Sequence, residues 1–203
     1  MVSRKRVTIY VEGGSRGALS SVCRKGFSQF LENAGLKGMM PKVVACGSRS
    51  DAYKRFCTAI SNHTPDEMPI LLVDSEGPVS ETPWLHVLHR EGDGWKKPDL
   101  AKDTHLHFMV QVMESLFLAD RAALTAYFGS EFKQSKLPKG NDLEAIPKLQ
   151  VFEGLKAATQ NCGREKTYHK GRHSFEILGR ISPQLVSDAS PSVKRLLQLL
   201  TPQ

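Results

Sequence analysis

Three stretches in the first part of the chain have the residue pattern of buried strands. Residues 6–12 and 41–47 are short and rich in β-branched side chains, and residues 68–77 are apolar almost without interruption until they reach an acidic end. Strands that are apolar on both faces are typical of parallel sheets covered by helices on both sides. The pattern predicts that the third stretch is a central strand of such a sheet.

Segments with helical periodicity separate these strands. Residues 18–34 carry apolar side chains at the spacing of one helix face and are followed by Gly35, a common helix stop. Residues 48–63 form a second such segment, with Ser48 or Ser50 as its N-terminal cap. The order β-α-β-α-β predicts parallel strands joined by right-handed crossovers.

The rest of the chain is expected to be mostly helical. Residues 78–104 contain prolines, glycines and both tryptophans without a period, which indicates an irregular segment covering the sheet. Residues 107–129 have an apolar stripe at helical spacing and predict one long helix. A further helix is expected from near Leu143, with Pro147 in its first turn, and a last one after a cap at Ser190.

These elements predict an α/β fold with a central, mostly parallel sheet flanked by helices and a helical C-terminal portion. A chain of 203 residues is long enough for one domain with its own core. We expect residues 1–203 to form a single domain, with its core over residues 5–130 and a helical extension over residues 131–203 packed on that core.

Composition and charge narrow the class of protein. With 40% hydrophobic and 24% charged residues, no apolar run long enough to span a bilayer and no signal-peptide pattern, the chain is expected to be a cytoplasmic protein without a membrane segment. A net charge of +7 favours an acidic partner, most commonly nucleic acid, although a solvated basic face is the alternative. The four cysteines include no C-x-x-C pair, which argues against a zinc ribbon or redox site.

Acidic residues stand at the ends of two predicted strands. Glu12 follows the first strand, and Asp74 and Glu76 follow the third. The carboxyl ends of parallel strands share one sheet edge, where ligands bind, and a D-x-E pair on an extended segment points to one side. Carboxylates are ligands for Mg²⁺, so the three acids are a candidate metal site. The alternative is that they cap helices or pair with lysines.

Two further places carry unusual charge. Glu114 lies in the apolar segment VQVMESLFLAD, so it is either solvated beside the apolar stripe or points into the site, and partial burial is expected. In YHKGRHS, Lys170, Arg172 and His173 surround a glycine and could bind phosphate, or form a solvated basic turn. There is no P-loop motif and no nucleophile-elbow motif.

The order of these motifs resembles a bacterial family described only as a domain of unknown function with a Toprim-like core. VEGG, LLVDSEGPV, HFMVQVMESLFLAD and YHKGRHSFEILGRI carry the resemblance, which covers almost the whole chain. It implies a Toprim-like Rossmannoid core, in which Glu12 matches the first-strand glutamate and Asp74 with Glu76 matches the usual D-x-D pair. Glu114 and Lys170 match positions typical of the smaller family.

The resemblance also implies a function. Toprim domains occur in topoisomerases, primases and nucleases of the overcoming-lysogenization-defect type, and they use Mg²⁺ for phosphoryl transfer. The expected activity is therefore Mg²⁺- or Mn²⁺-dependent hydrolysis of nucleic acid, with Glu12, Asp74 and Glu76 as metal ligands, Glu114 and Lys170 as further catalytic residues, and Lys170, Arg172 and His173 at the phosphate. Relatives often occur beside ATPase genes in phage-defence or mobile-element neighbourhoods. A non-catalytic subunit of an ATPase complex is the main alternative, and an enzyme acting on a small phosphate ester is a weaker one.

Overall fold

The computed structural model describes residues 5–14, 17–140 and 142–201, so residues 141, 202 and 203 of the expected extension lie outside the described part. Within that part, four strands form one sheet in the order β2-β1-β3-β4, and every neighbouring pair runs parallel. The strands are β1 Arg6–Val11, β2 Lys42–Ala45, β3 Glu67–Asp74 and β4 Leu106–Met109. The predicted α/β class, the parallel sheet and the central position of β3 are confirmed.

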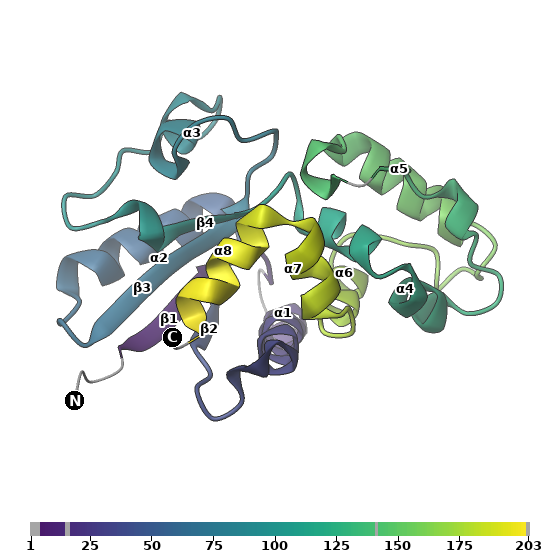
Figure 1. Ribbon diagram of the computed structural model, residues 1–203, viewed down its shortest axis with the longest axis horizontal. Coiled ribbons are helices and arrows are strands. Elements are labelled where there is room, and N and C mark those ends of the chain that lie inside the picture. The colour runs from purple at the N-terminus through teal and green to yellow at the C-terminus, as the bar shows by residue number, and fades with distance from the viewer. Residues whose placement is uncertain (1–4, 15–16, 141, 202–203) are drawn as a thin grey trace.

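The sheet is covered by helices on both faces, as Figure 1 shows. Successive side chains of β3 alternate between two hydrophobic clusters, because a strand turns every second residue to the same face. Ile70 and Leu72 belong to the cluster that includes helices α1 and α8, whereas Leu71 and Val73 belong to the cluster that includes α2 and α3. The fold is therefore a three-layer α/β/α arrangement around a buried strand.

Most of the helices predicted from the apolar spacing are present in the structure. Ser48 accepts a hydrogen bond from the backbone N–H of Asp51 at the start of α2, and Ser190 does the same for Val193 at the start of α8. Gly35 has a φ of 90° in a single wide turn that ends the first helix. The helices are α1 Gly17–Leu31, α2 Arg49–Asn62, α3 Pro83–His89, α4 Arg121–Phe128, α5 Lys148–Thr159, α6 Arg172–Leu178, α7 Pro183–Ala189 and α8 Pro191–Leu200; shorter turns are η1 Glu32–Leu36, η2 Asp103–His105, η3 Met113–Ala119, η4 Gln134–Lys136 and η5 Leu143–Ala145.

The single long helix predicted over residues 107–129 is wrong. The chain there forms strand β4, the 3₁₀ segment η3 and then the short helix α4, whose N-terminus is capped by Asp120 through Ala123 N–H. Nearly every side chain from Leu106 to Leu118 is buried, so no polar face marks a period. A continuous apolar run is compatible with a buried strand as well as with a helix, and here tertiary packing selected the strand.

Two other expectations need correction. The segment 78–104 is not wholly irregular, because α3 lies within it and begins at Pro83. The helix expected from Leu143 is displaced: η5 covers that residue, and α5 begins one residue after Pro147. The basic segment after residue 163, for which the sequence predicted no element, contains α6. In the described part of the chain, no helix is long and apolar enough to cross a membrane.

The helices of residues 131–201 pack on the same core as the sheet. Helix α6 lies against α1, and α8 lies against β4. Apolar side chains from α5 to α8 join those of β1 and β3 in one cluster. At the contact of α1 with α6, Gly26 faces the backbone of Phe175 so closely that a Cβ atom on Gly26 would collide with the Phe175 carbonyl.

We predict that Gly26→Ala destabilises the protein in spite of its location inside a helix. Alanine is about 1 kcal/mol better than glycine within a helix, but here the added methyl group overpacks the contact between α1 and α6, at a cost of about 1–3 kcal/mol. Urea unfolding should show a lower free energy of unfolding. The control is Ser21→Ala on an exposed position of α1, which should be neutral or stabilising. Equal stability of Gly26→Ala and wild type would contradict the packing.

Candidate functional site

The carboxyl ends of β1 and β3 open onto a cavity of about 270 Å³. Glu12 directly follows β1, and Asp74 is the last residue of β3. Their side chains line the cavity together with those of Glu114 and Lys170. The uncharged residues that complete the lining are Gly13, Gly14, Leu19, Gly47, Met109, Met113, Gly171, Ser174 and Phe175. The structure therefore brings four of the sequence-predicted site residues to one place.

Asp74 is the most enclosed of the acids that end strands. It is 4% exposed, because the alternation along β3 turns it to the face covered by α1 and the C-terminal helices. Its Oδ1 accepts a hydrogen bond of 2.8 Å from Met113 N–H, and its Oδ2 lies 3.7 Å from Lys170 Nζ. Burial raises the pKa of Asp74 well above its usual value, and the nearby carboxylates of Glu114 and Glu12 raise it further, with Lys170 opposing them.

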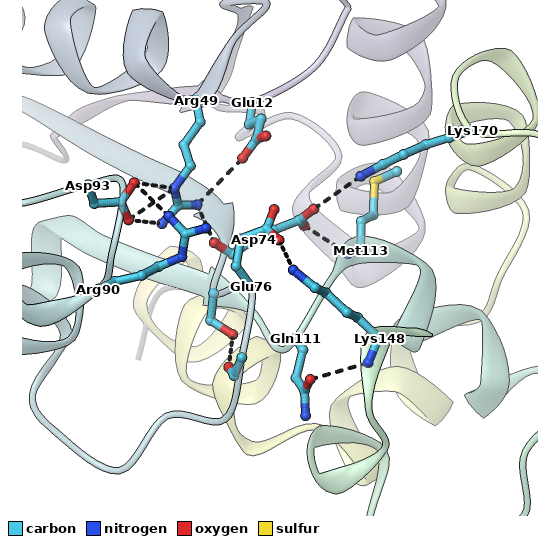
Figure 2. A network of polar contacts seen from close by, with 12 residues as sticks. Glu12, Arg49, Asp74, Glu76, Arg90, Asp93, Gln111, Met113, Lys148 and Lys170 are labelled. Carbon is cyan, nitrogen blue, oxygen red and sulfur yellow. Dashed lines mark hydrogen bonds and ion pairs between the residues drawn. The ribbon is translucent and has the colours of Figure 1, made fainter. Parts of the chain in front are cut away.

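Glu12 is held from the opposite layer of the fold by Arg49, the first residue of α2. Arg49 Nη1 lies 3.5 Å from Glu12 Oε2 and also donates to the backbone carbonyl of Asp74. The guanidinium binds both carboxylate oxygens of the buried Asp93, at 2.9 and 2.7 Å, and lies over the ring of Trp95. Burial raises the pKa of Glu12, and Arg49 limits that rise. Figure 2 shows Arg49 between Glu12 and Asp93.

Glu76 does not join the other acids in the cavity. The strand ends at Asp74, and Glu76 has a φ of 66°, so the expected two-residue alternation does not continue to Glu76. Its Oε2 lies 2.5 Å from Lys148 Nζ, at the start of α5, as Figure 2 shows. Burial acts to raise the pKa of Glu76, but the hydrogen bond and charge of Lys148 lower it overall. Glu76 therefore adds negative charge near the cavity, while its carboxylate binds Lys148 and not a group in the cavity.

Glu114 is completely buried, more than the partial burial that the sequence indicated. Its Oε1 accepts hydrogen bonds from Tyr168 Oη at 2.8 Å and Ser174 Oγ at 2.9 Å. Its Oε2 is buried without a hydrogen-bond partner, although an isolated buried carboxylate oxygen is costly. Burial and the charge of Glu114 together raise the pKa of Tyr168, which therefore keeps its proton.

The basic segment divides between two environments. Lys170 reaches the cavity, and although burial acts to lower its pKa, the charges of Glu114 and Asp74 raise it overall. Arg172 is exposed and binds Glu176 at 2.7 Å. His173 is buried beside aromatic rings, and burial together with His169 lowers its pKa. Neither Arg172 nor His173 lines the acidic cavity, so the structure separates these two predicted phosphate ligands from Lys170.

The donor atoms of the cavity suit a hard divalent cation. In the described residues, no group of three or more His, Cys, Asp or Glu side chains is placed to hold a metal as it stands. The acids are engaged by other groups, such as Lys170 at Asp74 and Arg49 at Glu12. Glu12 Oε2 and Glu114 Oε2 are nevertheless buried without a hydrogen-bond partner, and carboxylate oxygens are the ligands that Mg²⁺ takes. The set Glu12, Asp74 and Glu114 therefore fits such an ion by its chemistry.

Sequence reasoning missed the groups that balance the acids. Arg49 could have been found, because it begins the helix after β2 and so lies at the same sheet edge as Glu12. Lys148 stands at the start of α5, and Asp93 lies in the segment that covers the sheet. Tyr168 and Ser174 carry no motif for binding a buried glutamate. For these four residues only the tertiary contacts give a signal.

Comparison with known proteins identifies the family. No match was found among curated proteins, and none among solved structures. The family model described as Domain of unknown function (DUF4276) matches residues 11–201. This span contains Glu12, Asp74, Glu114 and Lys170, together with the helices that enclose the cavity. The chain belongs to the DUF4276 family.

Proposed function

We propose that the protein is a Mg²⁺- or Mn²⁺-dependent phosphodiester hydrolase of the Toprim type that acts on nucleic acid. The supporting observation is the convergence of Glu12, Asp74 and Glu114 on one cavity. Burial raises the pKa values of Glu12 and Asp74, and nearby carboxylates raise them further: Glu76 acts on Glu12, and Glu114 and Glu12 act on Asp74. The site therefore holds an excess of negative charge that a cation would relieve. Strongly perturbed carboxylates in a cavity favour a functional site.

In this proposal Glu12, Asp74 and Glu114 hold the metal. A bound divalent ion would supply the charge that stabilises a reacting phosphate and would lower the pKa of a water molecule. The proposed ligand set differs from the one that the sequence suggested, because Glu76 is bound to Lys148 outside the cavity and Glu114 lies inside it. Glu76 then contributes to the negative field and not to the ligand set.

The chain's own cations have separate tasks. Lys170 lies at the cavity and is 56% exposed, so it can turn from Asp74 to a phosphate oxygen of a substrate. Arg49 is anchored by Asp93 and holds Glu12 in position. The cavity is also lined by Gly13 and Gly14, where an added Cβ atom would collide with Phe175 and Cys23, so these glycines allow close packing of the cavity wall.

The substrate class is inferred from charge. A net charge of +7 favours binding to a polyanion, and nucleic acid is the commonest one. The Toprim resemblance adds a setting, in which the protein would act as an effector beside an ATPase in a phage-defence or mobile-element system. The setting supports the class of substrate and says nothing about catalysis in this chain.

One observation favours a second candidate, a non-catalytic partner subunit. Arg49, Lys148 and Lys170 already pair with Glu12, Glu76 and Asp74, as expected of a structural charge network. Such a network requires no metal. The two candidates differ in metal uptake: calorimetry with Mn²⁺ should detect binding to the wild type, weakened by Glu12→Gln, if the protein is a hydrolase.

We predict that Glu12→Gln and Asp74→Asn each lower metal-dependent cleavage of DNA or RNA by on the order of 100-fold or more, because each removes a carboxylate that acts at the reacting centre. Cleavage of plasmid DNA, single-stranded DNA and RNA with Mg²⁺ or Mn²⁺ is the measurement. Glu91→Gln and Asp99→Asn are matched controls on exposed positions and should retain wild-type activity. Equal activity of all five proteins, or none in the wild type, would overturn the proposal.

We also predict that Asp74→Asn stabilises the protein near neutral pH. The folded-state pKa of Asp74 is raised, so its ionised form costs stability above that pKa, and the wild type regains this stability as pH falls through it. The amide keeps an acceptor for Met113 N–H and carries no charge. The free energy of unfolding of Asp74→Asn should therefore exceed that of the wild type at neutral pH.

Urea unfolding of wild type and Asp74→Asn over a range of pH checks this prediction. The difference in free energy of unfolding should be largest near neutral pH and should shrink as pH falls toward about 4, where the carboxyl of the unfolded chain also takes up its proton. Asp99→Asn should not differ from wild type. A variant that is less stable than wild type at neutral pH would show that the ionised carboxylate is favoured by the fold.

A further inference from the structure

A second hollow, of about 410 Å³, lies between α1 and α6 next to the acidic cavity. Phe175 lines both hollows, so its ring is their common wall. Lys25, Arg172 and Arg180 line the second hollow, together with Val22, Gly26, Gln29, Glu176 and Gly179. We call this second hollow the basic groove.

The floor of the basic groove is formed by the close contact of α1 with α6. Gly26 lies against the backbone of Phe175, and a Cβ atom on Gly179 would lie 3.5 Å from Gly26 Cα. Because the two glycines carry no side chains, the helices approach closely and the longer side chains stand at the rim. The groove therefore combines two glycines at the helix contact with the basic side chains of Lys25, Arg172 and Arg180.

Among the described residues, three cations and one acid line the basic groove. Its acid, Glu176, is already engaged by Tyr127 Oη at 2.7 Å and by Arg172 Nε at 2.7 Å. The Arg180 guanidinium lies 4.7 Å from the centre of the Tyr127 ring, which leaves its N–H groups free to donate. Lys25 is exposed, and within the described residues neither Lys25 nor Arg180 forms an ion pair.

We propose that the basic groove binds the sugar-phosphate backbone of a single nucleic-acid strand next to the phosphate in the acidic cavity. A guanidinium that lies on an aromatic ring with free N–H groups is suited to bidentate phosphate binding, and a neighbouring lysine supplies a second charge. The ligand is taken to be a single strand because the basic groove is a small hollow, of about 410 Å³, between two helices in contact. The inference rests on the proposed function only for the choice of a nucleic acid as ligand.

Binding can be measured without catalysis. The experiment is fluorescence anisotropy of a labelled single-stranded DNA oligonucleotide with the full chain in the presence of a chelator, over a range of salt concentrations. Lys25→Gln/Arg180→Gln is compared with Lys54→Gln/Arg55→Gln, which removes the same charge from exposed positions of α2. Lys25→Glu and Lys54→Glu form a second matched pair at exposed lysines, where loss of folding is not expected.

The groove variant should bind about 10-fold more weakly than wild type, and the slope of log affinity against log salt should fall by roughly 1.4, the value for two phosphate contacts on a single strand. The α2 variant should keep the wild-type slope. Equal losses in the two double variants, or no binding by the wild type, would overturn the inference. So would displacement of the strand by a mononucleotide at an equal concentration of phosphate groups, because that result indicates a site for one phosphate.

The same variants separate this inference from the proposed function. Asp99→Asn should keep wild-type binding in the chelator, since Asp99 is exposed and lines neither the groove nor the acidic cavity. If binding depends on Lys25 and Arg180 while no protein cleaves any substrate, the hydrolase proposal fails and the groove stands. If cleavage requires Asp74 while binding is insensitive to both groove residues, the groove is wrong and the hydrolase proposal stands.

Discussion

Buried negative charge at the carboxyl edge of the sheet is the constraint on which the rest of the structure depends. Asp74 is nearly enclosed and Glu114 is fully enclosed, and carboxylates in such surroundings are costly unless other groups compensate them. The compensation comes from separate parts of the chain: Lys170 precedes α6, and Tyr168 and Ser174 donate hydrogen bonds to Glu114. The acids therefore tie the C-terminal helices to the end of the central strand.

The contact of α1 with α6 serves both the core and the candidate site. Gly26 allows α6 to approach α1, and this approach places Phe175 between the acidic cavity and the basic groove. Ser174, one residue earlier, turns to Glu114. A substitution that separates the two helices would therefore alter both the cavity wall and the hydrogen bond from Ser174 to Glu114. The packing of α1 on α6 and the position of Glu114 in the candidate site therefore depend on the same helix contact.

Glu12 and Asp74 do not serve the stability of the fold in their ionised forms, whereas Glu76 is stabilised by its pairing with Lys148. The pKa values of Glu12 and Asp74 are raised by burial, which means that their ionised forms lose free energy on folding. A fold under selection for stability alone would replace such groups with apolar or amide side chains. Local conflicts of this kind are expected at functional sites, where a ligand supplies the missing interaction. The proposed cation at Glu12, Asp74 and Glu114 is a ligand of that kind.

The sequence by itself determined the elements whose evidence is local. The strand that ends before Glu12, the strand that ends at Asp74 and the helix caps at Ser48 and Ser190 follow from short-range patterns, and the parallel order follows from chain topology. Topology also brought Glu12 and Asp74 to one edge, because parallel strands share the direction of their carboxyl ends.

Only the tertiary structure decided which charges meet. It placed Glu114 inside the cavity, bound Glu76 to Lys148 and turned Arg172 away from Lys170, although Arg172 is two residues further along the chain. It also formed β4 where an apolar period predicted a helix. The physical reason is the same in each case. A period or motif records only neighbours along the chain, whereas burial and ion pairing depend on residues that the fold brings together from distant segments.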